Sequence, residues 1–247
     1  TLVFAKQFAY IASMKKKKKI SSYKEITSSK RRPINKIKKA RNNVKKDNTR
    51  VYNLLRSMIE LYGVVSYSDL DYAYNEYYGE NECVDIPDNA LYFCDRCDNI
   101  KRIYIDRCPY YINRVLDKDE LEPMINDIIE RQTQITKKKI KLEELLKYAD
   151  YNYYEENASK NKFKKYLKTY DISNEMIEEI IMLISKTYRL GNDFIDISIE
   201  MLEDYGIDID MDNIKEILEF LNDIYNNTRL WSNNGWTPIE MRKNYKI

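Results

Sequence analysis

The sequence predicts a mainly α-helical protein, and three observations support this class. Apolar residues recur at helical spacing over several long stretches. One segment, residues 90–106, instead alternates its side chains and is rich in tyrosine and isoleucine, as strands are. The 247 residues include 43% hydrophobic side chains, which is enough to bury a core. We therefore expect helices packed around a small β-hairpin.

The first predicted elements are two helices joined by a short turn. Residues 50–63, RVYNLLRSMIELYG, carry apolar side chains at helical spacing and end in Gly63, a residue typical of helix C-termini. Ser66 then stands three residues before Asp69, which is a start signal, and Gly79 supplies a stop.

The alternating segment at residues 90–106 predicts the hairpin, with its turn at Asp98-Asn99. Helix, helix and hairpin in this order is the layout of a winged-helix unit. We assign a winged-helix-like module to residues 48–116. Residues 1–47 precede it as a basic arm that is disordered or partly helical.

Residues 117–247 predict a helical-bundle domain, because five apolar stripes at helical spacing need partners to be buried. The stripes are Leu121, Met124, Ile125, Ile128 and Ile129; Leu142, Leu145, Leu146 and Ala149; Phe163, Tyr166 and Leu167; Met176, Ile177, Ile180, Ile181 and Ile184; and Ile214, Ile217, Leu218, Leu221 and Ile224.

The last part of this domain, residues 226–241 (NNTRLWSNNGWTPIEM), contains both tryptophans of the chain. Residues 233–235 predict a turn, and residues 237–240, TPIE, predict a capping box that starts a short helix. We expect the tryptophans to pin this corner onto the helical body. Arg229 and Glu240 either form an ion pair across the corner or are exposed. The predicted structural motif comprises Trp231, Trp236, Arg229, Thr237, Pro238 and Glu240.

Charge is divided unevenly along the chain. Residues 1–50 hold 17 Lys or Arg and two acids, whereas the rest holds 25 and 38. A block of like charge is most typical of a solvated tail, and it also suits an arm that binds the phosphates of nucleic acid. Folding back onto the acidic body is a third interpretation.

Residues 30–46, KRRPINKIKKARNNVKK, form the densest basic stretch, and Pro33 can open a helix there. They would contact phosphates without reading bases. The predicted hairpin adds cations that can touch a nucleic-acid backbone, at Arg96, Lys101, Arg102 and Arg107. The predicted nucleic-acid-binding residues are Lys30, Arg31, Arg32, Lys36, Lys38, Lys39, Arg41, Lys45, Lys46, Lys101 and Arg102.

The second predicted helix does not suit the DNA major groove. It carries Asp69, Asp71, Glu76 and Glu80 and no Lys or Arg, so phosphates repel it. We expect it to be a scaffold or a partner-binding element. Its acidic, tyrosine-rich face is the candidate protein-binding surface, around Tyr72, Tyr74, Tyr77 and Tyr78.

Four cysteines, Cys83, Cys94, Cys97 and Cys108, lie close together in the sequence, and the central pair has zinc spacing. No flanking glycines form a knuckle, and the pair falls at the predicted hairpin turn. Free thiols in a reducing compartment are the favoured interpretation. A structural zinc site and a disulfide are the alternatives, and no other cofactor is expected.

Several chemistries lack the residues that they need. The chain has no histidine, which excludes imidazole catalysis, and its glycines fall at predicted helix ends or turns, which leaves none for a phosphate-binding loop. Asp208, Asp210 and Asp212, followed by Glu219, resemble a calcium loop, but Asn213 replaces its glycine and a helix start explains them better. We therefore expect a protein that is not an enzyme.

No segment approaches the roughly 18 apolar residues that span a bilayer. The apolar residues 1–13 precede the lysines at 15–19, the reverse of a secretory signal. The expectation is a cytoplasmic protein without a membrane segment. Residues 1–13 carry no functional prediction, because Met14 is an alternative start.

Residues 61–70 (LYGVVSYSDL), 142–157 (LEELLKYADYNYYEEN) and 226–241 resemble a group of α-rich proteins of low-GC Gram-positive bacteria (Firmicutes) and their mobile elements. Members of that group often continue into a short zinc-binding SEC-C tail. This chain ends at Ile247 without such cysteines, so the zinc function of the tail is not carried over. The resemblance implies an intracellular bacterial or phage protein with an adaptor or regulatory role. The residues of the chain leave three functions as hypotheses: non-specific nucleic-acid binding through the basic arm, protein binding alone, or a small structural zinc protein.

Overall fold

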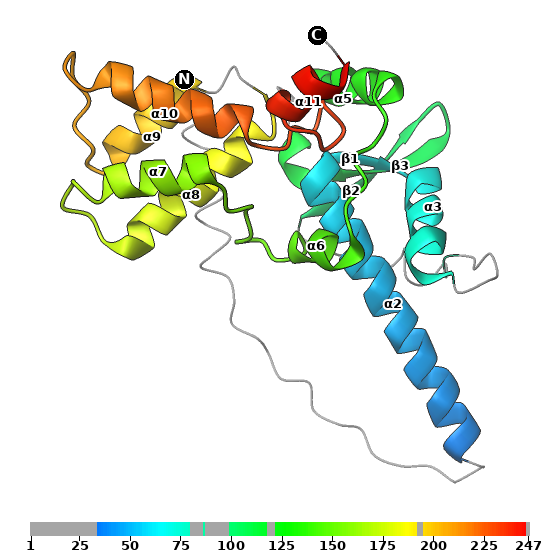
Figure 1. The fold of residues 1–247 in the computed structure, drawn as a ribbon. Coiled ribbons are helices and arrows are strands. Elements are labelled where there is room, and N and C mark those ends of the chain that lie inside the picture. The colour runs from blue at the N-terminus through cyan, green and yellow to red at the C-terminus, as the bar shows by residue number, and fades with distance from the viewer. Residues whose placement is uncertain (1–33, 80–85, 87–98, 118–121, 192–194, 246–247) are drawn as a thin grey trace. The chain divides into compact units, whose positions relative to one another are not determined.

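The computed structural model describes the backbone of residues 34–79, 86, 99–117, 122–191 and 195–245, with their side chains from residue 48 onward except at positions 122 and 245. This part of the chain is mainly helical and contains a three-stranded antiparallel sheet (Figure 1). The predicted α-rich class is confirmed. Residues 43–247 form one compact unit, and the packing described below lies within it.

Helix α2 (Ile34–Tyr62) is 29 residues long and begins in the basic stretch. Its second half presents a fully buried apolar stripe, formed by Val51, Leu54, Leu55 and Ile59. The helix ends before Gly63, whose φ of 75° is the left-handed conformation that glycine adopts without strain. One helix thus continues across residues 47 and 48, where the sequence placed the end of the arm.

Helix α3 (Tyr67–Tyr78) starts with the predicted capping box. The Ser66 hydroxyl accepts a hydrogen bond from the Asp69 N–H at 3.1 Å, and the Asp69 carboxylate accepts one from the Ser66 N–H at 3.3 Å. Gly79 is the C-cap. Between the two helices lies a strand that was not predicted, β1 (Val64–Ser66).

Strands β2 (Ile100–Ile105) and β3 (Cys108–Asn113) form the hairpin, and the sheet order is β1-β3-β2. The hairpin turns at Asp106 and Arg107, which have φ values of 50° and 67°. The predicted turn at Asp98-Asn99 is therefore wrong for this hairpin, because residues 100–105 pair with the chain that follows them. The predicted partner strand, residues 90–97, lies outside the described residues.

Each face of the sheet packs against a different set of helices, since successive strand residues point to opposite sides. Val65, Tyr111 and Ile100 join the core formed by α2 and α3. Val64 and Ile112 join a second core with residues of the next helix, α5 (Glu122–Gln134), and with Trp231. Both faces of the sheet are therefore covered near β1 and the end of β3, whereas Arg102 and Tyr104 on β2 are exposed.

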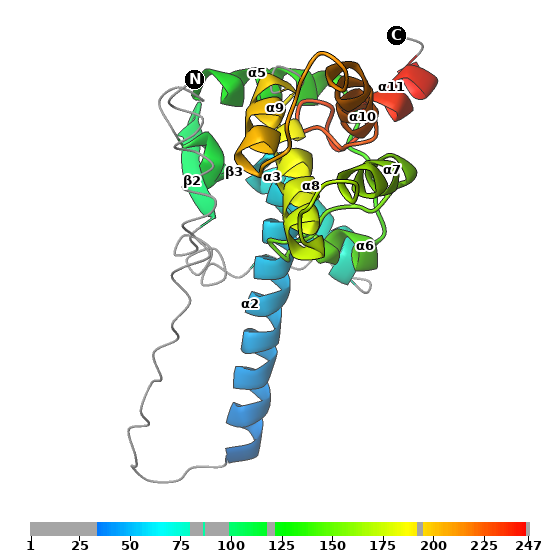
Figure 2. The same ribbon diagram turned by 90° about the vertical axis from the view of Figure 1, so that its left-hand side faces the viewer.

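The remaining helices follow in order. They are η2 (Arg114–Leu116), α6 (Leu142–Lys147), α7 (Ala158–Leu167), α8 (Asn174–Tyr188), α9 (Ile195–Asp204), α10 (Ile214–Asn226) and α11 (Pro238–Tyr245). Helices α7 to α10 pack on one another, as Figures 1 and 2 show. The predicted stripes correspond to α5, α6, α7, α8 and α10, whereas α9 was not predicted.

Candidate functional site: the groove between α3 and the strap

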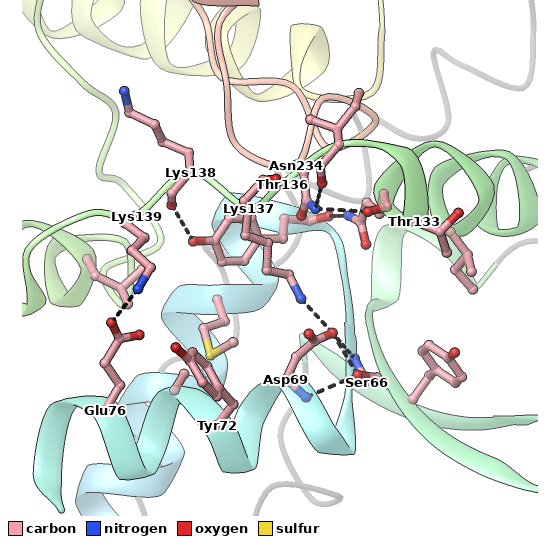
Figure 3. A pocket seen from close by; sticks show the side chains of 18 of the residues that line it. Ser66, Asp69, Tyr72, Glu76, Thr133, Thr136, Lys137, Lys138, Lys139 and Asn234 are labelled. Atoms are coloured by element: carbon pink, nitrogen blue, oxygen red, sulfur yellow. Dashed lines mark hydrogen bonds and ion pairs between the residues drawn. The ribbon is translucent and has the colours of Figure 1, made fainter.

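A cavity of about 620 Å³ lies beside helix α3. Its opposite wall is an extended segment between α5 and α6, residues 135–141 (ITKKKIK), here called the strap. Figure 3 shows α3 along one side and the strap crossing above it. Besides the strap lysines, the polar or aromatic lining includes Ser66, Asp69, Tyr72, Glu76, Tyr77, Tyr110, Gln132, Thr133 and Asn234.

Tyrosine hydroxyl groups bind the backbone of the strap. Tyr62 at the end of α2 donates to the Lys138 carbonyl at 2.9 Å, and Tyr77 on α3 donates to the Ile140 carbonyl at 2.6 Å. Burial raises the pKa of both phenols, so both remain protonated donors at neutral pH. The strap is thereby held by the two helices that precede the hairpin.

The C-terminal corner binds the strap from its other side. The Asn234 amide donates to the Ile135 carbonyl at 2.7 Å, and the Asn234 carbonyl accepts from the Lys138 N–H at 3.0 Å. The Trp236 indole donates to the Thr136 carbonyl at 2.7 Å. Four carbonyl groups of the strap, those of residues 135, 136, 138 and 140, are therefore bonded, which stabilises its extended conformation.

Two ion pairs cross the groove from the strap to α3. Lys137 Nζ lies 2.5 Å from Asp69 Oδ2, and Lys139 Nζ lies 2.8 Å from Glu76 Oε1 (Figure 3). Each ammonium group also lies near a tyrosine ring, at 5.6 Å from the Tyr62 centroid for Lys137 and 6.0 Å from the Tyr72 centroid for Lys139. A carboxylate and a tyrosine ring thus surround each of these lysines.

The two pairs differ in their exposure to solvent. Burial lowers the pKa of Lys137, although the Asp69 charge opposes this effect. Burial would raise the pKa of Asp69, but the charge and hydrogen bond of Lys137 and the bonds from Ser66 lower it below its usual value. The hydrogen bond with Glu76 raises the pKa of Lys139, whose side chain is 71% exposed. The outer pair is therefore the one that water can separate readily.

A buried ion pair joins α2 to Arg189, the C-cap residue of α8. Arg189 Nη1 lies 2.9 Å from Glu60 Oε2, and each side chain is 6% exposed. The Trp231 indole donates to the Glu60 carbonyl at 3.1 Å, and the Trp231 N–H donates to the Arg189 carbonyl at 3.0 Å. Trp231 is itself 3% exposed. This contact explains why a tryptophan stands at the corner, since its ring fills space while its N–H satisfies a buried carbonyl.

The rest of the corner forms the interactions that its residues suggested. Arg229 Nη1 lies 3.1 Å from Glu240 Oε2, and Arg229 Nε lies 2.8 Å from Glu155 Oε1. Thr237 and Glu240 bond each other's backbone N–H, as in a capping box, and α11 begins at Pro238. Trp236 is half-buried, with Lys138 Nζ at 4.0 Å from its ring centroid.

The predicted phosphate-binding residues fall into three groups. Lys30, Arg31 and Arg32 lie outside the described residues. Residues 36–46 lie in α2, where the backbone alone is described. Lys101 on β2 pairs with Asp117, and Arg102 lies over the exposed Tyr104 ring at 6.0 Å. Arg96 is outside the described residues, and Arg107 is exposed at the hairpin turn.

The predicted protein-binding face on α3 needs one correction. Tyr74 is 3% exposed and belongs to the core, whereas Tyr72 is 63% exposed. Tyr77 and Tyr78 are half-buried. The face is thus narrower than expected, because Tyr74 follows the buried stripe of Leu70 and Ala73 on the helix. The strap and its lysines were not predicted as part of the site, and only the run of three lysines at 137–139 could have drawn attention to it.

Of the predicted zinc ligands, Cys108 is an exposed free thiol at the start of β3. Cys83, Cys94 and Cys97 lie outside the described residues, so the zinc hypothesis stays a prediction. Within the described ranges, no three His, Cys, Asp or Glu residues are grouped as metal ligands. At the calcium-like stretch, Asp210 accepts bonds from the N–H groups of Asp212 and Asn213 just before α10.

No protein-family model, curated protein or solved structure matches the chain, so the resemblance to the Firmicutes group also stays a prediction. No helix in the described part of the chain is both long and apolar enough to cross a membrane.

Proposed function

We propose that this chain is a non-catalytic interaction protein that binds nucleic acid through its basic segment, without base selectivity. The observation that carries this proposal is the concentration of cations along one helical stretch. Lys36, Lys38, Lys39, Arg41, Lys45 and Lys46 fall within eleven consecutive residues of α2.

The spacing of these cations suits a nucleic-acid backbone. Eleven helical residues extend about 15 Å, a length over which duplex DNA presents about nine phosphate charges. Many cations of the folded unit are instead engaged internally, as in the pairs of Arg229 with Glu155 and of Lys164 with Glu178. The basic segment is therefore the part of the chain best suited to polyanions.

A titration of fluorescently labelled DNA at 50 and 200 mM salt tests this proposal. Six phosphate contacts predict a logarithmic salt slope of about −5 and a loss of about a thousandfold in affinity between the two concentrations. Replacing all six cations of residues 36–46 with Gln should abolish the binding.

The matched control removes six exposed lysines from the folded unit, which should leave most of the affinity. They are Lys147, Lys162, Lys165, Lys168, Lys215 and Lys243. Equal affinity of the wild-type protein and the variant without the cations of residues 36–46 would refute the proposal, and so would equal losses in both variants.

Protein binding by an adaptor is the second candidate function, and the groove on α3 is the observation that favours it. Its two carboxylates, Asp69 and Glu76, each bond a lysine. Such pairing suits recognition of a charged partner better than acid–base chemistry.

A further inference from the structure

The strap occupies the groove in the manner of a bound peptide. It is extended, α2 and α3 bind two of its carbonyl groups through tyrosine hydroxyls, and α3 binds two of its side chains through carboxylates. Peptide-binding domains use the same two kinds of contact: bonds to the peptide main chain give affinity, and sites for its side chains give specificity. The groove therefore already recognises one extended lysine-bearing sequence, from its own chain.

We propose that the groove of α3 is a docking site for an extended, lysine-rich segment of a partner protein, and that Lys137 and Lys139 occupy its two ammonium sites in the free protein. This inference rests on the adaptor function and is independent of nucleic-acid binding. The strap acts as an internal competitor, because an incoming lysine must replace one of its side chains at Asp69 or Glu76.

The geometry sets the spacing of the partner's lysines. Asp69 and Glu76 are seven residues apart on α3, which places them about 10.5 Å apart along the helix axis. Lys137 and Lys139 are separated by about 6.6 Å of extended chain, and their long side chains spread to reach both carboxylates. A partner with lysines two or three positions apart meets the same requirement.

The outer ammonium site is the natural point of entry. The Glu76 side chain is 36% exposed and its lysine is 71% exposed, so this pair separates at little cost. The Tyr72 ring beside it is 63% exposed and offers its face to a second ammonium group. The cavity of about 620 Å³ supplies room for partner side chains without moving the strap backbone.

Charge also selects the partner. A nucleic acid would meet Asp69 and Glu76 as well as the acidic surface of α3, and phosphates are repelled by both. An acidic peptide would have to replace Asp69 or Glu76 as the partner of a strap lysine. It would then be repelled by the carboxylate that it had replaced. A cationic peptide replaces a strap lysine with a lysine of its own, so each carboxylate keeps an ammonium partner.

The test uses the full chain and an N-terminally labelled synthetic peptide, ITKKKIKL, which copies residues 135–142. Wild-type protein should bind it weakly, because the strap competes. Lys139→Gln frees Glu76 and should strengthen binding at least threefold, the range expected from releasing an exposed ion pair. Lys137→Gln/Lys139→Gln frees both carboxylates and should strengthen binding tenfold or more, with circular dichroism to verify that the variant is folded.

Three comparisons make the outcome decisive. Adding Glu76→Gln to Lys139→Gln should return the affinity to the wild-type value, and Lys147→Gln, which removes an exposed lysine paired with Glu144 outside the groove, should change nothing. A peptide with glutamine at its first and third lysines should bind more weakly than the parent. The proposal would be overturned if Glu76→Gln did not change the affinity of the Lys139→Gln variant for the peptide. It would also be overturned if the wild type and both strap variants bound the peptide equally. DNA affinity should stay unchanged in every variant, so a failure here is distinguishable from a failure of the nucleic-acid proposal.

Discussion

Replacing Arg189 with Met should cost more stability than any surface substitution, because it leaves the buried Glu60 carboxylate without its cation. In the structure Arg189 Nη1 lies 2.9 Å from this carboxylate and 3.1 Å from the Glu60 carbonyl. After the substitution the carboxylate keeps the Asn113 amide, at 3.3 Å. Removing one partner of a buried ion pair costs about 3–5 kcal/mol. We expect a loss in this range in the free energy of unfolding.

Urea denaturation at pH 7 measures the loss, and Arg131→Met on the exposed side of α5 provides the control, with an expected change within about 0.5 kcal/mol. The double variant Glu60→Gln/Arg189→Met should recover part of the stability, because it removes the isolated charge. A loss below about 1 kcal/mol for Arg189→Met, or a double variant as unstable as the sum of its single variants, would refute the reasoning.

Two further predictions concern the corner and a buried lysine. Trp231→Ala should lower the free energy of unfolding by about 3–5 kcal/mol, whereas Trp236→Ala at its half-buried position should cost less; similar small losses would show that Trp231 does not anchor the corner. Lys160 is 2% exposed, and burial lowers its pKa to about 7 in the folded protein from 10.5, while its ammonium group donates to the Glu155 carbonyl. Between these values the unfolded chain binds one more proton, so folding gains about 1.4 kcal/mol per pH unit as pH rises. Between pH 7 and pH 9.5 the Lys160→Met variant should therefore gain about 3 kcal/mol less stability than the wild type. The control variant Lys162→Met should behave as the wild type does. Parallel pH profiles of stability for Lys160→Met and wild type would contradict this prediction.

Local patterns predicted the elements whose signals are contained within a few residues. The capping boxes at Ser66 and Thr237 each join groups three residues apart, so they depend little on the rest of the fold. The apolar stripe of α10 and its end at Asn226 were also predictable. In each case neighbouring residues alone supply the bonds or the amphipathic face.

The sequence did not predict elements whose local conformational preference differs from the conformation that tertiary packing imposes. Helix α9 has the sequence IDISIEMLED, whose alternating isoleucines resemble a strand, yet the helix buries Met201 and Leu202. The hairpin turn at Asp106 and Arg107 lacks the glycine that such φ values favour. Its position follows from the pairing of β3 with both β1 and β2, which places Tyr111 and Ile112 in two different cores.

The sequence by itself determined the helical class, the segregation of charge, the capped helix starts and the location of the tryptophan corner, because each depends on composition or on near neighbours. Tertiary structure alone decided that residues 135–141 lie along α3, that Lys137 and Lys139 meet Asp69 and Glu76, and that Glu60 is buried against Arg189. These contacts join residues 63 to 129 positions apart. Whether such charges meet is set by how the apolar faces of the helices pack, and no short stretch of sequence contains that information.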